Sequence, residues 1–437
     1  MGFTLKPVRV GICGFGTVGG GTFNVLERNS KEITRRTGRT IVVEQIAQRR
    51  PNMNCDTGDT SITDDIFAVA NNPNVDVLIE LIGGHEPAKE LVLTAIRNGK
   101  HVVTANKALI AVHGNEIFEA AAKHNVVVAY EAAIAGGIPI VKAMREGLAA
   151  NSIDWLAGII NGTGNFILTE MRDKGRAFAD VLQEAQELGY AEADPTFDVE
   201  GIDAAHKLTI LSSVAFGIPL QFDKCYTEGI SKISAQDVAN AESLGFRIKH
   251  LGLTRRTPEG IELRVHPTLI PEKRLIANVN GVMNAVLVEG DAVGPTMYYG
   301  AGAGAEPTAS SVIADLVDIV RDMSLDQTVR MPSLGFSPET MSDSPILPME
   351  KVVTAFYMRM NVSEKPGVLA QITQILGDAG ISIEAIRQHT HVSAQVPVII
   401  LTRPVVEGHM NSAIAAIEAL ADVNGEVTRI RVENLGG

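Results

Sequence analysis

The chain has 437 residues, 45% hydrophobic and 20% charged, which is enough for about three globular domains. Its formal net charge of −13 disfavours nucleic acid and anionic membranes as partners, because phosphate groups require a clustered basic surface. The 3 cysteines form no CxxC pair, which is typical of a reducing compartment and excludes a disulfide framework. No apolar run approaches the ~20 residues that cross a bilayer, and the N-terminus has no signal-peptide core. We therefore expect a cytoplasmic protein.

The first third of the chain alternates short apolar runs with amphipathic stretches. Strands are expected at 8–13, 40–47, 75–82, 101–105 and 126–130, and helices at 19–28, 87–98 and 114–124. Strands rich in β-branched residues and separated by helices indicate a parallel sheet covered on both faces. We predict a doubly wound Rossmann domain over residues 1–135, completed by a helix at 308–330.

The middle of the chain changes texture. Strands are expected at 153–160, 249–254, 261–266 and 284–289, and helices up to residue 169 and at 181–188 and 201–216. A glycine-rich stretch, YYGAGAGAEPTAS, is expected as a loop before a helix at 310–322. Helices followed by strands indicate an α+β domain, the expected catalytic and dimerisation domain over residues 136–307.

The last quarter begins with a linker and ends in a small module. Prolines and serines are frequent in 331–350, which favours a linker. Residues 351–437 then give strands at 353–362, 381–387, 396–402 and 427–432, and helices at 368–377 and 410–420. This βαββαβ order predicts a ferredoxin-like module.

A GxGxxG motif follows the first strand and opens a helix. Its residues are Gly14, Phe15, Gly16, Thr17, Val18 and Gly19. The three glycines permit a tight turn, a close approach of the pyrophosphate and close helix–strand packing, and the helix N-terminus attracts the phosphates. A turn that binds nothing is the alternative, but the strand–turn–helix context favours a dinucleotide.

The second strand ends in Arg49 and Arg50, without the carboxylate that usually binds the ribose 2′-hydroxyl of NAD. Glu44 lies too early in the strand. Two cations favour the 2′-phosphate of NADP, although use of NAD and a plain solvated surface both stay open.

The stretch GYAEADPTFDVEGIDAAHK concentrates carboxylates before a lysine. Asp203 and Lys207 are four residues apart, so they share a face of an apolar helix. Such a pair is either a structural ion pair or a site. A dry lysine can protonate the alkoxide that forms when hydride reaches a carbonyl, while Asp203 and Glu192 could accept a substrate ammonium.

Two further segments could complete this site. Lys107 follows a strand at the edge of the sheet where ligands of open α/β folds bind, although lysines there are equally often plain surface. The backbone N–H groups of 161–165, before a helix, could bind a substrate carboxylate. The 10 histidines show no zinc-ligand spacing, and no GxSxG turn indicates a hydrolase.

Five segments in order, GFGTVGGG, TANKALIA, GIINGTGNFIL, GYAEADPTFDVEGIDAAHK and YGAGAGAEPTAS, resemble homoserine dehydrogenase over about three quarters of the chain. The resemblance implies reversible reduction of L-aspartate 4-semialdehyde to L-homoserine with NAD(P)H. It implies Lys207 as proton donor and acceptor, Lys107 close to cofactor and substrate, and Glu192 and Asp203 as substrate ligands. It also implies cofactor contacts at Gly189, Glu192, Gly302 and Gly304, beside Phe15, Thr17 and Val18.

In that family a monovalent cation, typically sodium, is held near a hinge. The matching segment YEAAIAGGIP implies Glu131, Ile134, Gly136 and Ile138 as ligands, the last three through main-chain carbonyls. Oxygen ligands of this kind suit a hard cation.

The tail YMRMNVSEKPGVLAQITQILGDAGISI resembles an ACT domain, a ligand-binding module of amino-acid enzymes. The resemblance implies a homo-oligomer, dimer or tetramer, and an effector, threonine, bound near 366–369 and 377–381. A purely structural tail is the alternative. Two rival functions stay open: a Rossmann oxidoreductase for another semialdehyde or keto acid, and a catalytically silent amino-acid-binding regulator.

Overall fold

The computed structural model describes residues 6–323, 325, 330–388 and 395–436. Parts of the expected first and last domains and of the helix at 308–330 lie outside these residues. The chain forms two compact units: unit 1 spans 1–162, 203–223 and 282–344, and unit 2 spans 163–202, 224–281 and 345–437. Among the described helices, none combines the length and the apolar character needed to cross a membrane.

Unit 1 contains a six-stranded parallel sheet with the order β3-β2-β1-β4-β5-β6. Its strands are β1 (Val8–Cys13), β2 (Ile41–Ala47), β3 (Ser61–Thr63), β4 (Val77–Glu80), β5 (His101–Thr104) and β6 (Val128–Ala129). This order is that of a Rossmann fold, whose ligands bind at the carboxyl ends of the strands. The predicted doubly wound sheet is confirmed, and only β3, which is short and largely exposed, was missed.

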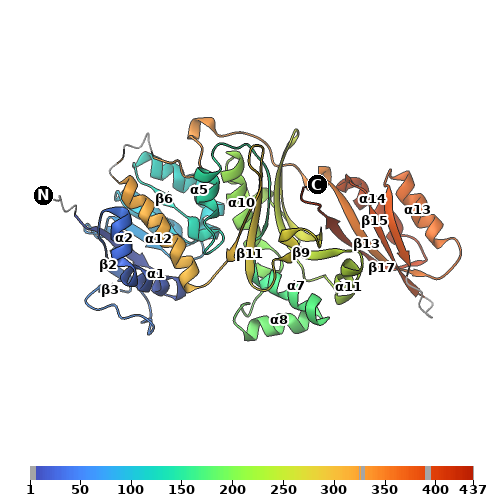
Figure 1. Cartoon of the computed structure of the whole chain (residues 1–437), viewed down its shortest axis with the longest axis horizontal. Coiled ribbons are helices and arrows are strands. Elements are labelled where there is room, and N and C mark those ends of the chain that lie inside the picture. Colours follow the sequence, from blue (N-terminus) through green and yellow to red (C-terminus); the bar gives the residue numbers. More distant parts are fainter. Residues whose placement is uncertain (1–5, 324, 326–329, 389–394, 437) are drawn as a thin grey trace. The chain divides into compact units, whose positions relative to one another are not determined.

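Helices cover this sheet: α1 (Thr17–Arg28), α2 (Ser30–Thr37), α3 (Ile66–Asn71), α4 (Ala88–Arg97), α5 (Lys107–Lys123) and α12 (Ala305–Asp322). Although α12 is distant in sequence, it lies beside α1 (Figure 1) and shares a buried core with β1 through Val312 and Leu316. The two helices approach closely because Gly21 has no side chain: a Cβ there would lie 2.6 Å from the carbonyl oxygen of Ala305.

The rest of unit 1 includes an antiparallel sheet of order β12-β11-β7, formed by β7 (Ile153–Ile159), β11 (Met283–Gly290) and β12 (Gly294–Ala301). Shorter elements are η1 (Glu131–Ala133), α6 (Ile140–Lys142), η2 (Ala143–Gly147), η3 (Phe222–Lys224) and η6 (Pro338–Thr340), beside the buried helix α10 (Ile202–Phe216). The prediction of a loop from Tyr298 was wrong, because the first residues of that stretch end β12. Likewise α12 begins at Ala305, not at Ser310.

Unit 2 combines part of the expected middle domain with the C-terminal module. Its first elements are α7 (Gly162–Lys174), α8 (Phe178–Glu187), α9 (Thr196–Val199), β8 (Tyr226–Thr227), α11 (Ala235–Ser243), β9 (Phe246–Thr257), β10 (Gly260–Pro271) and η4 (Leu275–Asn278). The module comprises η7 (Met349–Lys351), β13 (Val353–Ser363), α13 (Val368–Asp378), β14 (Ile383–Gln388), β15 (Gln395–Thr402), β16 (Val405–Val406), α14 (Glu407–Glu418) and β17 (Val423–Val432). Apart from the short β16, its order is the predicted βαββαβ.

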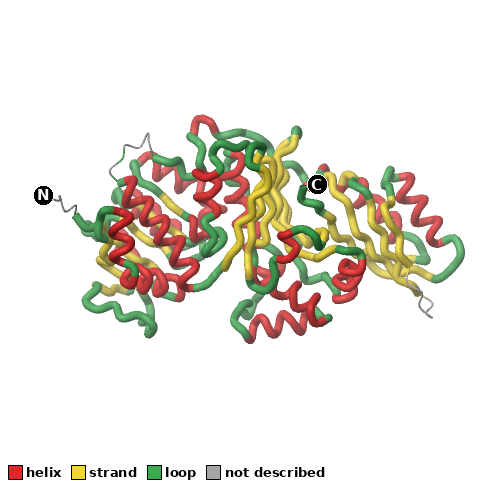
Figure 2. The backbone as a smooth tube through the Cα atoms, in the orientation of Figure 1, coloured by secondary structure: helices red, strands yellow, loops and turns green. Residues whose placement is uncertain are grey.

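Six strands of unit 2 follow one another in the order β9-β10-β17-β13-β15-β14 (Figure 2), while β8 pairs with β10 and β16 with β13. Strand β17 pairs in parallel with β10, with Thr268 opposite Arg431, so the C-terminal module is joined to the preceding strands through backbone hydrogen bonds. One face of the module's strands packs under its own helices, for example through Ile372 and Ile417. On the opposite face of these strands, Tyr357 and Ile399 belong to a second core with α8 and α11.

Candidate active site

The glycine-rich turn has the geometry of a dinucleotide site. Gly14 follows β1 with φ +94°, and a Cβ there would lie 2.6 Å from the carbonyl carbon of Leu81. A Cβ at Gly19 would overlap the carbonyl oxygen of Gly14, whereas one at Gly16 would meet nothing within 4 Å. The first and third glycines therefore permit close packing, and the second faces open space before the N-terminus of α1. The residues present fit a bound pyrophosphate.

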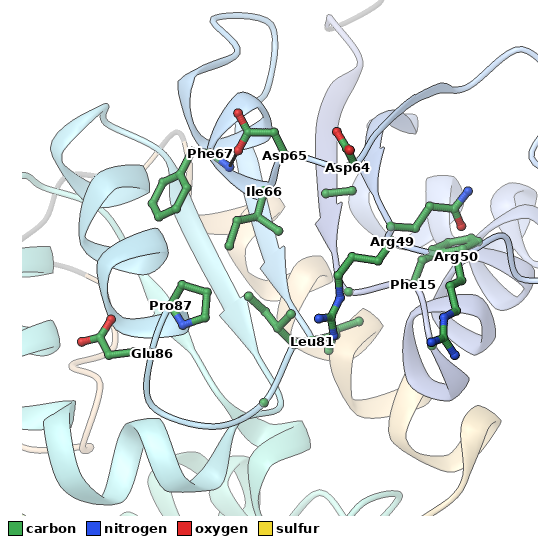
Figure 3. Close-up of a pocket in the computed structure, with 16 residues that line it drawn as sticks. Phe15, Arg49, Arg50, Asp64, Asp65, Ile66, Phe67, Leu81, Glu86 and Pro87 are labelled. Carbon is green, nitrogen blue, oxygen red and sulfur yellow. Dashed lines mark hydrogen bonds between the residues drawn. The ribbon is translucent and has the colours of Figure 1, made fainter.

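A cavity of about 1010 Å³ lies at the carboxyl ends of β1, β2 and β4. Phe15, Arg49, Arg50 and Leu81 are among its lining residues, and Figure 3 shows the two guanidinium groups on the same side of it. The carboxylate of Asp64, also at the cavity, points away from them (Figure 3). The predicted cofactor residues of the turn and of β2 are thus brought together.

Two polar side chains, one within β2 and one after it, have structural partners. Glu44 on β2 forms an ion pair with Arg9. Asn52 donates from Nδ2 to the carbonyl oxygens of Phe15 (3.2 Å) and Gly16 (3.1 Å), and so helps to fix the glycine-rich turn. The sequence analysis missed Asn52, since an asparagine in an irregular segment gives no signal of its partner.

The predicted catalytic residues of unit 1 form a cluster around one buried carboxylate, with Lys207 buried and Lys107 half-buried. Asp203 Oδ2 accepts hydrogen bonds from the Lys207 ammonium (2.7 Å) and from Asn161 Nδ2 (2.9 Å). Asp203 Oδ1 lies 2.9 Å from the Lys107 ammonium. Lys207 also donates to the carbonyl oxygen of Ile160 (2.7 Å). The i,i+4 ion pair is present, and it is more than a helix-surface pair because a second lysine shares its carboxylate.

The two lysines of the cluster keep the Asp203 carboxylate ionised. Burial alone would raise the pKa of Asp203, but the ammonium groups of Lys207 and Lys107 outweigh it and hold that pKa well below its usual range. Burial lowers the pKa of the adjacent His206 to about 4, so its imidazole, which is stacked on Phe222, adds no positive charge near neutral pH. The cluster therefore presents two lysines beside a carboxylate, an arrangement suited to proton transfer at a substrate oxygen.

The segment expected to hold a cation is anchored to α12. The buried Glu131 accepts backbone N–H bonds from Val141 (2.8 Å) and Lys142 (2.7 Å), and its own N–H donates to Asp315 (2.8 Å). One turn earlier on α12, Ser311 donates to the carbonyl oxygen of Gly136 (2.5 Å). Each of these oxygens retains a second lone pair. In chemical type the oxygens of Glu131, Ile134, Gly136 and Ile138 fit a hard monovalent cation.

The remaining predicted site residues are distributed over both units. Gly302 in unit 1 packs against the segment 131–138, since a Cβ at Gly136 would lie 2.5 Å from the carbonyl group of Gly302. Gly304 directly precedes α12. Gly189 and Glu192 are exposed in unit 2, on the loop between α8 and α9. The stretch 161–165 is not a loop before a helix, because α7 already begins at Gly162.

Comparisons with known proteins agree along the chain. Protein-family profiles match for "Homoserine dehydrogenase, NAD binding domain" over residues 14–131, "Homoserine dehydrogenase" over 139–317 and "ACT domain" over 357–422. A homoserine dehydrogenase from Pseudomonas aeruginosa is 68% identical, covering 99% of this chain and 100% of that protein.

Solved structures give the same answer. A homoserine dehydrogenase from Thiobacillus denitrificans is 62% identical, with a TM-score of 0.94 and 99% of both chains covered. A hyperthermophilic archaeal homoserine dehydrogenase mutant in complex with NADPH is 25% identical, with a TM-score of 0.63, and covers 74% of this chain and 100% of that chain. The chain belongs to the homoserine dehydrogenase family of NAD(P)-dependent oxidoreductases and carries a C-terminal ACT domain.

Proposed function

We propose that the protein catalyses the reversible reduction of L-aspartate 4-semialdehyde to L-homoserine with NADPH, a step of threonine, methionine and isoleucine biosynthesis. The observation that carries this proposal is the Lys107–Asp203–Lys207 cluster, in which Asp203 and Lys207 are buried and Lys107 is half-buried. Lys107 opens α5 directly after β5, at the same edge of the parallel sheet as the glycine-rich turn. Lys107, which pairs with the same carboxylate as Lys207, therefore begins its helix at the sheet edge that also carries the dinucleotide site.

The residues act on the aldehyde oxygen and on the charged end of the substrate. Bound NADPH supplies the hydride to the aldehyde carbon. Lys207 donates a proton to the oxygen, which completes the alcohol, and then regains a proton from solvent. Asp203 holds Lys207 in place and attracts the substrate ammonium, while Lys107 stabilises the developing negative charge. Glu192 and Gly189 keep the substrate and cofactor roles that the resemblance implies.

Arg49 and Arg50 support NADPH over NADH, because two guanidinium groups at the end of β2 can bind a 2′-phosphate. The carboxylate of Glu44 is already paired with Arg9, so we expect it not to repel such a phosphate. The NADPH complex of the archaeal relative points the same way. Use of NADH as a poorer cofactor stays compatible with this site.

The direct test is an NADPH-oxidation assay with aspartate semialdehyde. We expect turnover with this substrate, with NADH a poorer donor, and little turnover with glutamate semialdehyde or a simple keto acid. Equal rates with the longer semialdehyde would contradict the substrate assignment. Absence of turnover from a protein that still binds NADPH would favour the silent regulator.

We further propose that sodium binds at the oxygens of Glu131, Ile134, Gly136 and Ile138, where it would neutralise buried negative charge. Burial raises the pKa of Glu131, and it also raises that of Asp315, which lies beside Glu131. A cation there would add order to the segment next to Gly302. Replacing sodium by tetramethylammonium should lower the unfolding temperature of the wild type and leave Glu131→Ala less affected. An equal shift in both proteins would argue against this site.

The ACT domain supports regulation by an amino acid, and we propose threonine as the effector and a homo-oligomer, dimer or tetramer, as the assembly. Edge strand β14 ends the sheet of unit 2 and exposes Ile386 at 38%, which suits pairing with a second copy.

We also propose a cytoplasmic location. Cys13, Cys55 and Cys225 are free thiols, in keeping with a cytoplasmic enzyme.

A further inference from the structure

Glu80 is a fully buried carboxylate at the end of a parallel strand that is otherwise apolar. It is the last residue of β4 (VLIE), with an exposed fraction of 0%. A buried carboxylate is costly unless several donors bind it. The hydrogen-bond partners of Glu80 therefore indicate its role at this position.

One carboxylate oxygen binds the loop that follows β4. Glu80 Oε1 accepts the backbone N–H groups of Ile82 (2.8 Å) and Gly83 (3.1 Å). Leu81, Ile82 and Gly83 line the dinucleotide cavity. The loop also lies against the glycine-rich turn, because a Cβ at Gly14 would contact the backbone of Leu81. Glu80 therefore fixes one wall of the cofactor site.

The other carboxylate oxygen leads to α5. Glu80 Oε2 accepts the hydroxyl of Thr104 (2.5 Å), and the Thr104 oxygen accepts the backbone N–H of Asn106 (3.0 Å). The Asn106 side chain caps α5 at Leu109 N (3.1 Å) and donates to the carbonyl oxygen of Gly84 (2.7 Å). Asn106 is followed by Lys107, whose ammonium pairs with Asp203.

These bonds form a closed network, defined here as the Glu80 network: Glu80, Thr104, Asn106 and the backbone of 82–84. Its three side chains are 5% exposed or less. Burial raises the pKa of Glu80, while the bonds from Thr104 and from the loop N–H groups oppose that shift. Ile82, Gly83 and Thr104 each donate to a Glu80 oxygen, and an ionised carboxylate can accept all three bonds.

We infer that Glu80 is a positioning residue for hydride transfer: through one carboxylate it holds both the cofactor-facing loop 81–84 and the start of α5 that presents Lys107. This inference rests on the proposed role of Lys107 at the active site. A misplacement of about 1 Å between reacting groups costs on the order of 100-fold in rate, so such a brace affects kcat without touching the substrate.

Four substitutions test the network: Glu80→Gln, Thr104→Val and Thr104→Ser act on the arm to α5, and Glu80→Ala removes both arms. Glu80→Gln retains an oxygen for the loop N–H groups but presents an amide N–H₂ to Thr104, so we expect the NADPH Kd, measured by fluorescence titration, within about threefold of wild type and kcat at least about tenfold lower. Thr104→Val removes the hydroxyl and should give the same pattern, whereas Thr104→Ser should recover most of kcat. Glu80→Ala should weaken NADPH binding as well.

The matched control is Lys100→Met at the opposite edge of the sheet. The Lys100 ammonium is buried and binds the carbonyl oxygens of Asn72 (2.6 Å) and Val75 (2.8 Å). Its loss should lower the unfolding temperature but leave kcat and KM near wild type. Wild-type kcat in Glu80→Gln and Thr104→Val, or an equal loss of kcat in Lys100→Met, would overturn the inference. Substantial turnover in Lys207→Ala would instead count against the proposed chemistry.

Discussion

Asp203 and Lys207 lie one turn apart on α10 and are joined by a buried hydrogen bond of 2.7 Å. The opposite oxygen of the same carboxylate lies 2.9 Å from the ammonium of Lys107, which belongs to another helix. Because Asp203 stays ionised, it can hold two positive charges, one on the buried Lys207 and one on the half-buried Lys107. This arrangement makes the cluster sensitive to the loss of any one member.

Lys207→Ala should reduce kcat by roughly 100- to 10,000-fold, the usual contribution of a positioned proton donor. NADPH affinity should stay nearly normal, since the dinucleotide cavity is formed by β1, β2 and β4. Stopped-flow measurement of NADPH oxidation, with a separate fluorescence titration of binding, checks both statements. Lys100→Met is the control for loss of a buried ammonium. Near-normal turnover in Lys207→Ala would remove Lys207 from the mechanism.

Arg49→Ala with Arg50→Ala should raise the KM for NADPH by about tenfold or more while changing that for NADH little. The reason is the loss of charge-assisted hydrogen bonds to the 2′-phosphate, each worth about 1.5–3 kcal/mol. The control is Arg35→Ala, which removes an exposed guanidinium on α2. It should leave the KM for both cofactors unchanged. Parallel increases for both cofactors would show that the two arginines do not read the 2′ position.

Gly377→Asp should abolish the response to threonine and preserve basal turnover. A Cβ at Gly377 meets no atom within 4 Å, so the added carboxylate should be tolerated while it alters the proposed effector site. Deletion of the module is a poorer test, because β17 pairs with β10 and its removal would uncover that strand. Gly147→Asp in unit 1, equally free of contacts, is the matched control. Unchanged inhibition in Gly377→Asp would favour a structural tail.

Lys249→Met should change the pH dependence of stability. Burial and then the neighbouring Arg172 and Arg247 lower the pKa of Lys249 to about 7, below the 10.5 expected in the unfolded chain. Between these values the unfolded chain binds more protons, so unfolding costs the wild type more as pH rises, by roughly 1 kcal/mol per pH unit from this group.

The unfolding temperature of the wild type relative to Lys249→Met should therefore increase from pH 7 to pH 9.5. Below pH 7 the lysine is protonated in both states and the difference should level off. Lys273→Met, on an exposed turn, should show a flat difference over the same range. A flat difference above pH 7, like that of Lys273→Met, would mean that Lys249 remains charged in the folded protein.

Local patterns predicted much of the fold and part of the site. The β-branched runs of β1 and β4 are buried on both faces, so a continuous apolar strand was a reliable signal. The glycine spacing after β1 and the four-residue spacing of Asp203 and Lys207 are properties of one turn or one helix. The start of α5 was missed although Asn106, a good N-cap residue, marks it.

Long-range pairings were decided only by the tertiary structure. No local pattern indicates that Lys107 meets Asp203, that Glu80 binds Thr104, or that β17 joins β10, because these partners are brought together by the order of strands and by packing. The sequence by itself determined which segments become strands and helices and where phosphate can approach, since neighbouring residues control those features. Which charged groups are buried together depends on chain segments that meet only after folding, and only then is the cost of removing them from water offset by their partners.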